Sequence, residues 1–488
     1  MATASLKKNT IYNILKSCST VLFPLITFPY ASRVLLPDNI GKVNFAAAFI
    51  SYFALIASLG CSAYAIRECS GVRDDKEKMG YVASQIFSIN VYSTLAALVL
   101  LMLSLVLFRD LDNYRLLIVI QASTIVFTTV GTDWINSATE DFGYITLRTF
   151  FFQLISLLAI FLFVKTPDDY VKYAIISVLS ASGANILNVF YCRRFCKITF
   201  YAKPEWKKHM KPILLLFTMI LAQTIFKNTD ITMLGLMKGD FEVGIYSTAI
   251  KIYNIINQFV TSIMWVLLPR VSYLFTENSR EELHALLGKA LSFLAGLGLP
   301  IIAGVIVTAP DIVLICAGSE YMGAALPLRI LMIAFFFSLF GGGFMGNIIM
   351  IPSGKEAHFL KACVIAALAN VVLNFFLIPL YGESAAALTT GIAEIIIFFV
   401  LLPHTIKAVK IKGIAKIFVP PLVGSAAILA VGRILGRLIT TLWLRFILTV
   451  GACVAVYGAV LLLMRYELLI DTLKKLLCKF KRSKSLEG

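Results

Sequence analysis

Five charged side chains stand inside long apolar stretches of this sequence, where charges are rare. They are Lys16, Lys227, Asp230, Lys251 and Glu394. A charge at the centre of a membrane costs about 2.5 to 3.5 kcal/mol on insertion scales, so such residues usually face a partner or a water-filled cavity. Ammonium groups lining a cavity suit the phosphate oxygens of an anionic substrate. Carboxylates in the same place suit ion pairing or proton transfer.

Asp230 and Lys251 are the clearest candidate pair. They lie equally far from the middle of the turn near residue 240, on the two arms of an expected helical hairpin, so they reach the same depth. The pair is either a structural ion pair or a switchable pair that lines a cavity. Lys227 comes three residues before Asp230 and therefore lies on a nearby face of the same helix.

Arg33 and Asp133 extend this set, and Lys16 and Glu394 each have two interpretations. Arg33 stands at the outer end of the first apolar stretch, and together with the three lysines it could form a positive cavity that suits a pyrophosphate. Lys16 either belongs to that cavity or extends its ammonium group to the inner membrane interface. Glu394 is either a proton site or an acid held by a hydrogen bond to a neighbouring Ser, Thr or backbone group. Asp133 is either a proton site or a structural residue at the membrane interface.

The composition requires a membrane protein. The chain has 488 residues, of which 59% are hydrophobic and only 15% are charged, against about a quarter charged in soluble domains. A soluble globular enzyme is therefore excluded. The net charge of +17 would suggest nucleic acid in a soluble protein, but membrane topology explains it here.

Fourteen apolar windows are long enough to cross a membrane, at about 20 residues each. They cover residues 10–34, 43–66, 81–108, 116–134, 142–164, 173–192, 213–236, 245–268, 290–309, 325–351, 359–380, 384–402, 417–431 and 446–464. With these spans, 30 of the 44 basic residues fall on the side of the N-terminus and 11 on the other. The positive-inside bias therefore predicts that both termini are cytoplasmic.

An internal repeat relates the two halves. Pro37–Gly41 links the first two spans and Gly239–Gly244 links the seventh and eighth, with Gly41 and Gly244 aligned at an offset of 203 residues. A second match aligns Arg148 with Lys361. Because each unit holds six spans, the copies share one orientation and are related by an axis along the membrane normal. The alternative is chance similarity between apolar segments.

These observations predict an all-α polytopic protein with two parallel six-helix repeats. The expected organisation is an N-lobe at 1–192, a basic cytoplasmic linker at 193–211, a C-lobe at 212–403, two added spans within 404–465 and a basic cytoplasmic tail at 466–488. Cys192 and Cys196 are the only close cysteine pair, which does not make a metal site. No phosphate-binding loop of the Gly-Lys-Ser/Thr kind occurs, so no cofactor is expected beyond a coupling H+ or Na+.

Several segments, in order and spacing, resemble the polysaccharide transporter (Wzx-type flippase) branch of the MOP exporter superfamily. They are 28–35, 41–45, 65–68, 133–148, 230–235, 244–246, 251–253 and 377–382. The resemblance implies a V-shaped pair of six-helix lobes plus two C-terminal helices. It also implies that polyprenyl-diphosphate-linked oligosaccharide crosses by alternating access, driven by an ion gradient or the membrane potential. Within these segments, Arg67, Glu140 and Arg148 are candidates for a cytoplasmic gate or interface.

The resemblance further implies a bacterial cytoplasmic membrane, and polysaccharide polymerase and glycosyltransferases as partners. The chain departs from the more strongly cationic flippases of this kind by having few deep arginines, which leaves the head-group charge and the coupling ion open. Two other functions compete. A MATE-like multidrug or cation antiporter is the first. A membrane enzyme acting on lipid-linked sugars is the second, although the longest break, at 193–211, is short and basic.

Overall fold

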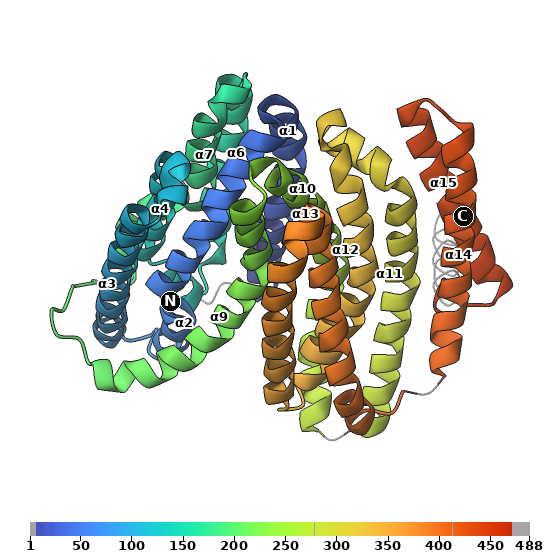
Figure 1. Cartoon of the computed structure of the whole chain (residues 1–488). Helices are drawn as coiled ribbons and strands as arrows, with labels where there is room; N and C mark the ends of the chain where they lie inside the picture. Colours follow the sequence, from blue (N-terminus) through green and yellow to red (C-terminus); the bar gives the residue numbers. More distant parts are fainter. Residues whose placement is uncertain (1–5, 278, 412, 471–488) are drawn as a thin grey trace, which may run out of the picture. The chain divides into compact units, whose positions relative to one another are not determined.

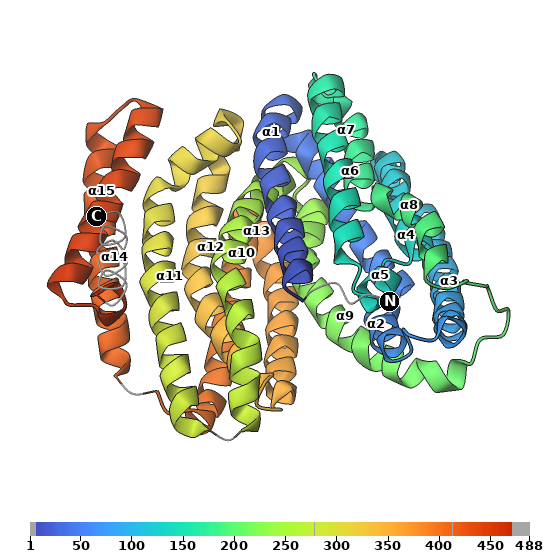
Figure 2. The same ribbon diagram turned by 180° about the vertical axis from the view of Figure 1, so that it is seen from behind.

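The computed structural model describes residues 6–277, 279–411 and 413–470, and none of these lies in a β-strand (Figure 1). The same helices are seen from behind in Figure 2. The α-helices are α1 (Leu6–Ser58), α2 (Cys61–Gly71), α3 (Lys76–Leu107), α4 (Arg115–Gly131), α5 (Trp134–Ala138), α6 (Phe142–Phe163), α7 (Tyr170–Val178), α8 (Ala184–Tyr191), α9 (Trp206–Met237), α10 (Asp240–Thr276), α11 (Arg280–Cys316), α12 (Ala325–Ser338), α13 (Glu356–Ala408), α14 (Ile414–Leu438) and α15 (Leu442–Leu463).

Two of these helices are too long to be single membrane spans. Helices α1 and α13 have 53 residues each, about 80 Å at about 1.5 Å per residue, against a hydrocarbon core of about 30 Å. Each contains one residue with non-helical angles: Leu36 (φ 63°, ψ 168°) in α1 and Gly382 (φ 55°, ψ −131°) in α13. The sequence analysis placed a boundary between two spans at both positions, so each long helix consists of two limbs.

By length and composition, ten helices of the described residues can cross a membrane, or eleven if the bent α10 is counted as one span. The two long helices each hold two of the expected spans. The all-helical membrane architecture is therefore established, while the count of fourteen stays a prediction. Helix α14 begins before the expected span and continues through Pro420 and Pro421 to Leu438.

By packing, the chain divides into two compact units. One comprises Met1–Ser247 with Cys316–Glu320, and the other Thr248–Ile315 with Tyr321–Gly488. In the first unit α1 packs against α3, α4, α6 and α9. In the second, α13 packs against α12 and the π-helix η6 (Leu339–Met350), and α14 packs against α15. The lobe boundaries of the sequence analysis stay predictions.

The two turns of the internal repeat interlock within the first unit. A methyl group added at Gly41 would lie 1.9 Å from the carbonyl oxygen of Asp240, and one added at Gly244 would lie 2.1 Å from that of Pro37. In the repeat alignment Gly41 corresponds to Gly244, and Pro37 corresponds to Asp240. The contact is thus reciprocal, as a two-fold axis between like elements produces. This supports the interpretation of two parallel repeats.

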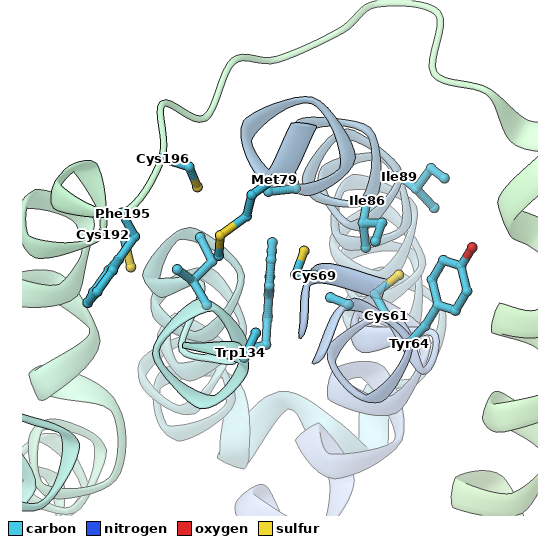
Figure 3. Packing of buried hydrophobic residues seen from close by; sticks show 14 of the residues in the cluster. Cys61, Tyr64, Cys69, Met79, Ile86, Ile89, Trp134, Cys192, Phe195 and Cys196 are labelled. Carbon is cyan, nitrogen blue, oxygen red and sulfur yellow. The ribbon is translucent and has the colours of Figure 1, made fainter. Parts of the chain in front are cut away.

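A buried apolar cluster joins α2, α3 and α5 to the segment after α8 (Figure 3). Met79 and Trp134 lie in its middle, between Phe195 on one side and Tyr64 on the other. Its four cysteines are Cys61, Cys69, Cys192 and Cys196, and all are free thiols. Cys192 and Cys196 are therefore both part of this apolar core.

Candidate functional site

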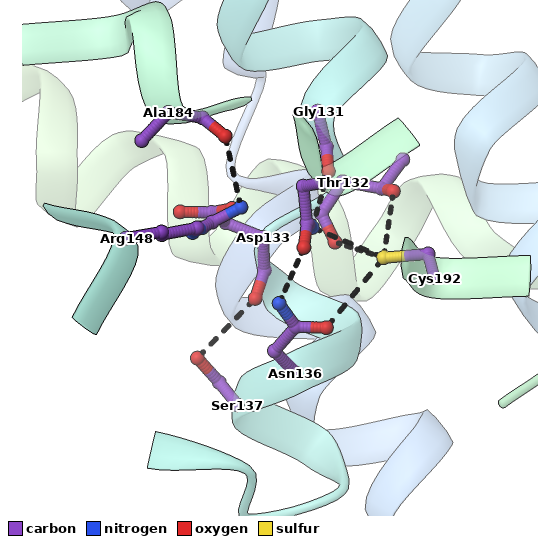
Figure 4. A network of polar contacts seen from close by, with 9 residues as sticks. Gly131, Thr132, Asp133, Asn136, Ser137, Arg148, Ala184 and Cys192 are labelled. Carbon is purple, nitrogen blue, oxygen red and sulfur yellow. Dashed lines mark hydrogen bonds and ion pairs between the residues drawn. The ribbon is translucent and has the colours of Figure 1, made fainter. Parts of the chain in front are cut away.

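An ion pair between Asp133 and Arg148 lies at the centre of a polar network in the first unit (Figure 4). Asp133 follows Thr132, which ends α4 in the left-handed conformation with φ 46°. Arg148 lies on α6, and its side chain is only 3% exposed, whereas that of Asp133 is 43% exposed. Arg148 Nη1 also donates to the carbonyl oxygen of Ala184, at 3.3 Å. The pair therefore connects the end of α4 to α6 and to the start of α8.

Beside this pair, a set of neutral side chains fixes the short helix α5. Asn136 Nδ2 donates to Asn188 Oδ1 at 2.6 Å, and Asn188 Nδ2 donates to the carbonyl oxygen of Gly131 at 2.6 Å. The Cys192 thiol lies 3.5 Å from Asn136 Oδ1 and completes the set (Figure 4). Buried networks whose members find partners stiffen the elements that carry them. Helix α5 is thus held firmly between α4 and α8.

Aromatic rings extend the network to the first turn of α6 and the last turn of α8. The ring of Tyr144 stacks on that of Tyr191, with centroids 3.5 Å apart and planes at 8°. The Arg148 guanidinium lies over the Tyr144 ring, 5.3 Å from its centroid. Tyr191 donates its hydroxyl to Asp141 Oδ2 at 2.6 Å. Arg148 is therefore enclosed by a carboxylate, a carbonyl and an aromatic face.

The three candidates for a cytoplasmic gate or interface do not share one contact. Glu140 pairs with Arg73 at 2.6 Å. Arg67 is exposed and pairs with its neighbour Glu68 at 3.0 Å. Only Arg148 joins another residue singled out from the sequence, namely Asp133. That pairing was not predicted, although the two opposite charges lie only 15 positions apart in the sequence.

Asp230 lies on α9 and is buried, with 3% of its surface exposed. It accepts a hydrogen bond from the Tyr246 hydroxyl at 2.8 Å, within the first unit. Lys251 is half-buried on α10. The proposed Asp230–Lys251 pair stays a prediction, and Tyr246 is a partner that the sequence analysis did not name.

Of the other cations expected in the cavity, the structure describes the side chain of Arg33 alone. Arg33 is exposed on the first limb of α1, where its Nη1 donates to the carbonyl oxygen of Pro29 at 3.4 Å. Lys16 lies on α1 and Lys227 on α9, and the side chains of both are outside the described residues. Their role in a cationic cavity stays a prediction.

Glu394 is buried in the second unit, with 8% of its surface exposed. Its Oε1 accepts a hydrogen bond from Ser338 at 3.0 Å. Ser338 is the last residue of α12, directly before the π-helix η6. Four glycines, Gly341, Gly342, Gly343 and Gly346, all fall in η6. π-Helical segments often occur at functional sites.

Asp311 on α11 and Arg445 on α15 form a second ion pair, which the sequence analysis missed; their side chains are 9% and 22% exposed. Arg445 Nε donates to both carboxylate oxygens of Asp311, at 3.0 and 3.2 Å. The two residues are 134 positions apart, and nothing in the sequence links them. The pair attaches α15 to α11. Among the described residues, no group of three or more His, Cys, Asp or Glu side chains could hold a metal ion.

The fold and its buried charges define a polytopic integral membrane protein. The chain matches the family described as "Polysaccharide biosynthesis protein" over residues 6–275, more than half of its length, and it belongs to that family. A second family model, MatE, matches residues 215–376.

The individual relatives have low sequence identity to this chain, and some of them match it along most of its length. The chain is 24% identical over 408 residues to the "Putative O-antigen transporter" of Escherichia coli (strain K12), covering 82% of this chain and 96% of that one. It is also 24% identical over 171 residues to the "Probable low-salt glycan biosynthesis flippase Agl15" of Haloferax volcanii, about a third (34%) of each chain. Among solved structures, the lipid II flippase MurJ in an inward closed conformation superposes with a TM-score of 0.73 at 17% identity, covering 95% of this chain and 99% of MurJ. That likeness establishes the fold.

Proposed function

We propose that the protein is a flippase that moves a polyprenyl-diphosphate-linked oligosaccharide, the repeat unit of a surface polysaccharide, from the inner to the outer leaflet. The observation that carries this proposal is the similarity to the O-antigen transporter along 82% of the chain, together with membership of the polysaccharide biosynthesis family. The relatives are named transporters and flippases, which supports transport over catalysis.

The proposed substrate site is cationic. Arg33, Lys16, Lys227 and Lys251 would bind the diphosphate, because ammonium and guanidinium groups form strong charge-assisted hydrogen bonds with phosphate oxygens. Since insertion of a charge into the membrane is costly, a lysine such as Lys251 is expected to face a partner or a wet path. Transport follows by alternating access, in which the site opens first to one side of the membrane and then to the other.

Buried acids are the proposed coupling residues, and ion pairs near helix ends are the proposed gate. Asp230 and Glu394 are buried carboxylates that could exchange a proton or bind a sodium ion during the cycle. Asp133, Arg67, Glu140 and Arg148 lie near helix ends on the side expected to be cytoplasmic, where rearrangement of ion pairs could open or close the path. An ion gradient or the membrane potential supplies the energy.

The protein would reside in a bacterial cytoplasmic membrane with both termini inside, next to the polymerase and glycosyltransferases that make and use its substrate. The basic bias of the expected inner loops supports this orientation. Attachment of a reporter to each terminus would test it, because a reporter active only in the cytoplasm must be active at both ends.

The test of function is leaflet accessibility of a fluorescent polyprenyl-diphosphate saccharide in sealed proteoliposomes, with and without a proton or sodium gradient. We expect flipping that depends on the protein and is accelerated by one gradient. Lys251→Ala should reduce flipping strongly. Lys238→Ala, which removes the same charge from the exposed end of α9, serves as the control. Unchanged flipping by a well-expressed Lys251→Ala protein would contradict the assigned site.

The second candidate function is a MATE-like cation antiporter, favoured by the MatE match over residues 215–376. The same vesicles decide between the two. Uptake of a lipophilic fluorescent cation in exchange for protons or sodium, with no movement of lipid-linked saccharide in a total native glycolipid pool, would favour the antiporter. Glu394→Gln should abolish gradient dependence under either function if Glu394 is the coupling site.

A further inference from the structure

Helix α13 brings two histidines and three lysines together where its two ends meet. It begins at Glu356 and ends at Ala408, and Gly382 divides it into two limbs of equal length. At about 1.5 Å per residue, both ends therefore return to the same level. His358 lies near the first end and His404 near the second. This juxtaposition is a direct result of the helix reversal.

The two imidazole rings are in contact. Their centroids are 4.1 Å apart and their planes are at 53°. Both rings are half-buried, whereas Lys355, Lys361 and Lys407 around them are exposed. The charged groups that act on His404 are His358 and these three lysines. Glu356, next to Lys355 in the sequence, is also exposed.

Ordinary packing does not account for this cluster. Like charges gathered on one patch repel each other and raise the local concentration of anions. The Nδ1 atom of His358 is buried and has no hydrogen-bond partner within the described part of the chain. Buried polar atoms without a partner are rare in native proteins. Internal hydrogen bonding therefore does not explain why a histidine occupies this position.

We propose that the cluster of His358, His404, Lys355, Lys361 and Lys407 is a binding site for the phosphate groups of a diphosphate. The ammonium groups would donate charge-assisted hydrogen bonds to the phosphate oxygens, and the imidazole nitrogens other than the buried Nδ1 of His358 would add further donors. The site lies on the side of the membrane that the positive-inside bias predicts to be cytoplasmic. It shares no residue with the set of cations proposed above for translocation.

The diphosphate could come from two sources. One is free pyrophosphate in solution, and the other is the head group of a prenyl diphosphate lipid. The second source rests on the proposed function, since a flippase must first capture its lipid on the inner side. The binding itself does not depend on that function.

The competing explanation is that the lysines only mark the cytoplasmic side of the membrane, as the positive-inside rule requires. That rule accounts for lysines but not for a pair of histidines in ring contact. Substitutions of the histidines, which leave the lysines in place, therefore separate the two explanations.

The experiment is calorimetric titration of the purified full-length protein with inorganic pyrophosphate and, separately, with geranyl diphosphate. The variants are His358→Gln/His404→Gln and Lys355→Gln/Lys361→Gln/Lys407→Gln. A control, Lys197→Gln/Lys203→Gln/Lys207→Gln, removes three exposed lysines of the linker and changes the net charge equally. Size-exclusion profiles confirm that each variant is folded.

We expect saturable binding of pyrophosphate by the unmodified protein. Both cluster variants should bind at least about tenfold more weakly, the effect of losing one charge-assisted hydrogen bond. The linker control should bind as the unmodified protein does. Equal affinity for the two probes would show recognition of the diphosphate alone, and tighter binding of geranyl diphosphate would identify the lipid as the source.

Absence of saturable binding, an equal loss in the linker control, or full affinity in the histidine variant would each overturn the proposal. The outcome is independent of transport. A protein that binds pyrophosphate through this cluster but moves no lipid in proteoliposomes would refute the proposed function and leave the site in place.

Discussion

The ion pair between Asp133 and Arg148 has two unequal members, which predicts that one substitution harms the fold more than the other. The Arg148 side chain is 3% exposed and that of Asp133 is 43% exposed. Asp133→Asn leaves a buried guanidinium charge, with the Ala184 carbonyl and the Tyr144 ring as neighbours. Arg148→Met leaves a carboxylate that water can reach. We therefore expect Asp133→Asn to be the more destabilising change.

The magnitudes follow from burial. Removal of one partner from a buried pair costs about 3 to 5 kcal/mol. Because the amide of an asparagine keeps an oxygen that can accept a hydrogen bond, we expect Asp133→Asn to cost about 3 kcal/mol, the lower end of that range. Arg148→Met loses a hydrogen bond of about 1 kcal/mol and an ion pair whose exposed member limits it to about another 1 kcal/mol. The difference is about 1 kcal/mol or more.

The assay is unfolding of the purified protein in mixed micelles by denaturant, for the two single variants and the double variant. In Asp133→Asn/Arg148→Met the stranded charge is gone, so the double variant should be more stable than Asp133→Asn alone. This order is not expected if the two residues act independently. Equal losses in the single variants, or a double variant less stable than both, would refute the reasoning.

Three further predictions concern single positions. Gly41→Ala should abolish the monodisperse peak of folded protein in size-exclusion chromatography, because the added methyl group would lie 1.9 Å from a backbone oxygen. Gly288→Ala, with open space around the added methyl group, should keep that peak. Gly382→Ala should lower stability by about 1 to 3 kcal/mol, since φ 55° with ψ −131° is essentially restricted to glycine; Gly391→Ala on the same helix is the control, and an equal loss there would contradict this. His209, in the linker segment, is 2% exposed and lies 2.8 Å from the Tyr64 hydroxyl, and burial lowers its pKa. The unfolded chain therefore binds the proton more readily, so the stability of the fold should decrease as the pH drops below about 6.5. In thermal unfolding scans, His209→Gln should flatten this dependence of stability on pH. An unchanged slope in the variant would refute the prediction.

The helices and their breaks were predictable because membrane burial leaves a direct record in the sequence. Apolar windows located the helices, and Pro37 and Gly382 mark the two places where a long helix reverses. The repeat was visible as well, since both of its turns need a glycine. What the sequence could not show is that these turns contact each other, because a packing contact between segments some 200 residues apart leaves no local pattern.

The site residues stay predictions, and the structure shows contacts of some of them that the sequence analysis did not name. The sequence analysis sought a cation for Asp230, whereas the structure adds the Tyr246 hydroxyl as a partner. A buried carboxylate can be satisfied by neutral donors, and tyrosines are too common in membrane helices to single one out. Asp311 and Arg445 are separated by 134 residues, so only the packing of α15 against α11 reveals their pair.

The partners of Asp133 and Glu394 separate a structural carboxylate from a candidate for coupling. Arg148 can only donate hydrogen bonds, so protonation of Asp133 would leave a buried guanidinium without a counter-charge. Ser338 can donate or accept, so its hydroxyl can serve Glu394 both as a carboxylate and as a protonated acid. A site that must gain and lose a proton in each cycle needs a partner of the second kind. Since Ser338 directly precedes the π-helix η6, a change in the charge of Glu394 would act at the start of that helix.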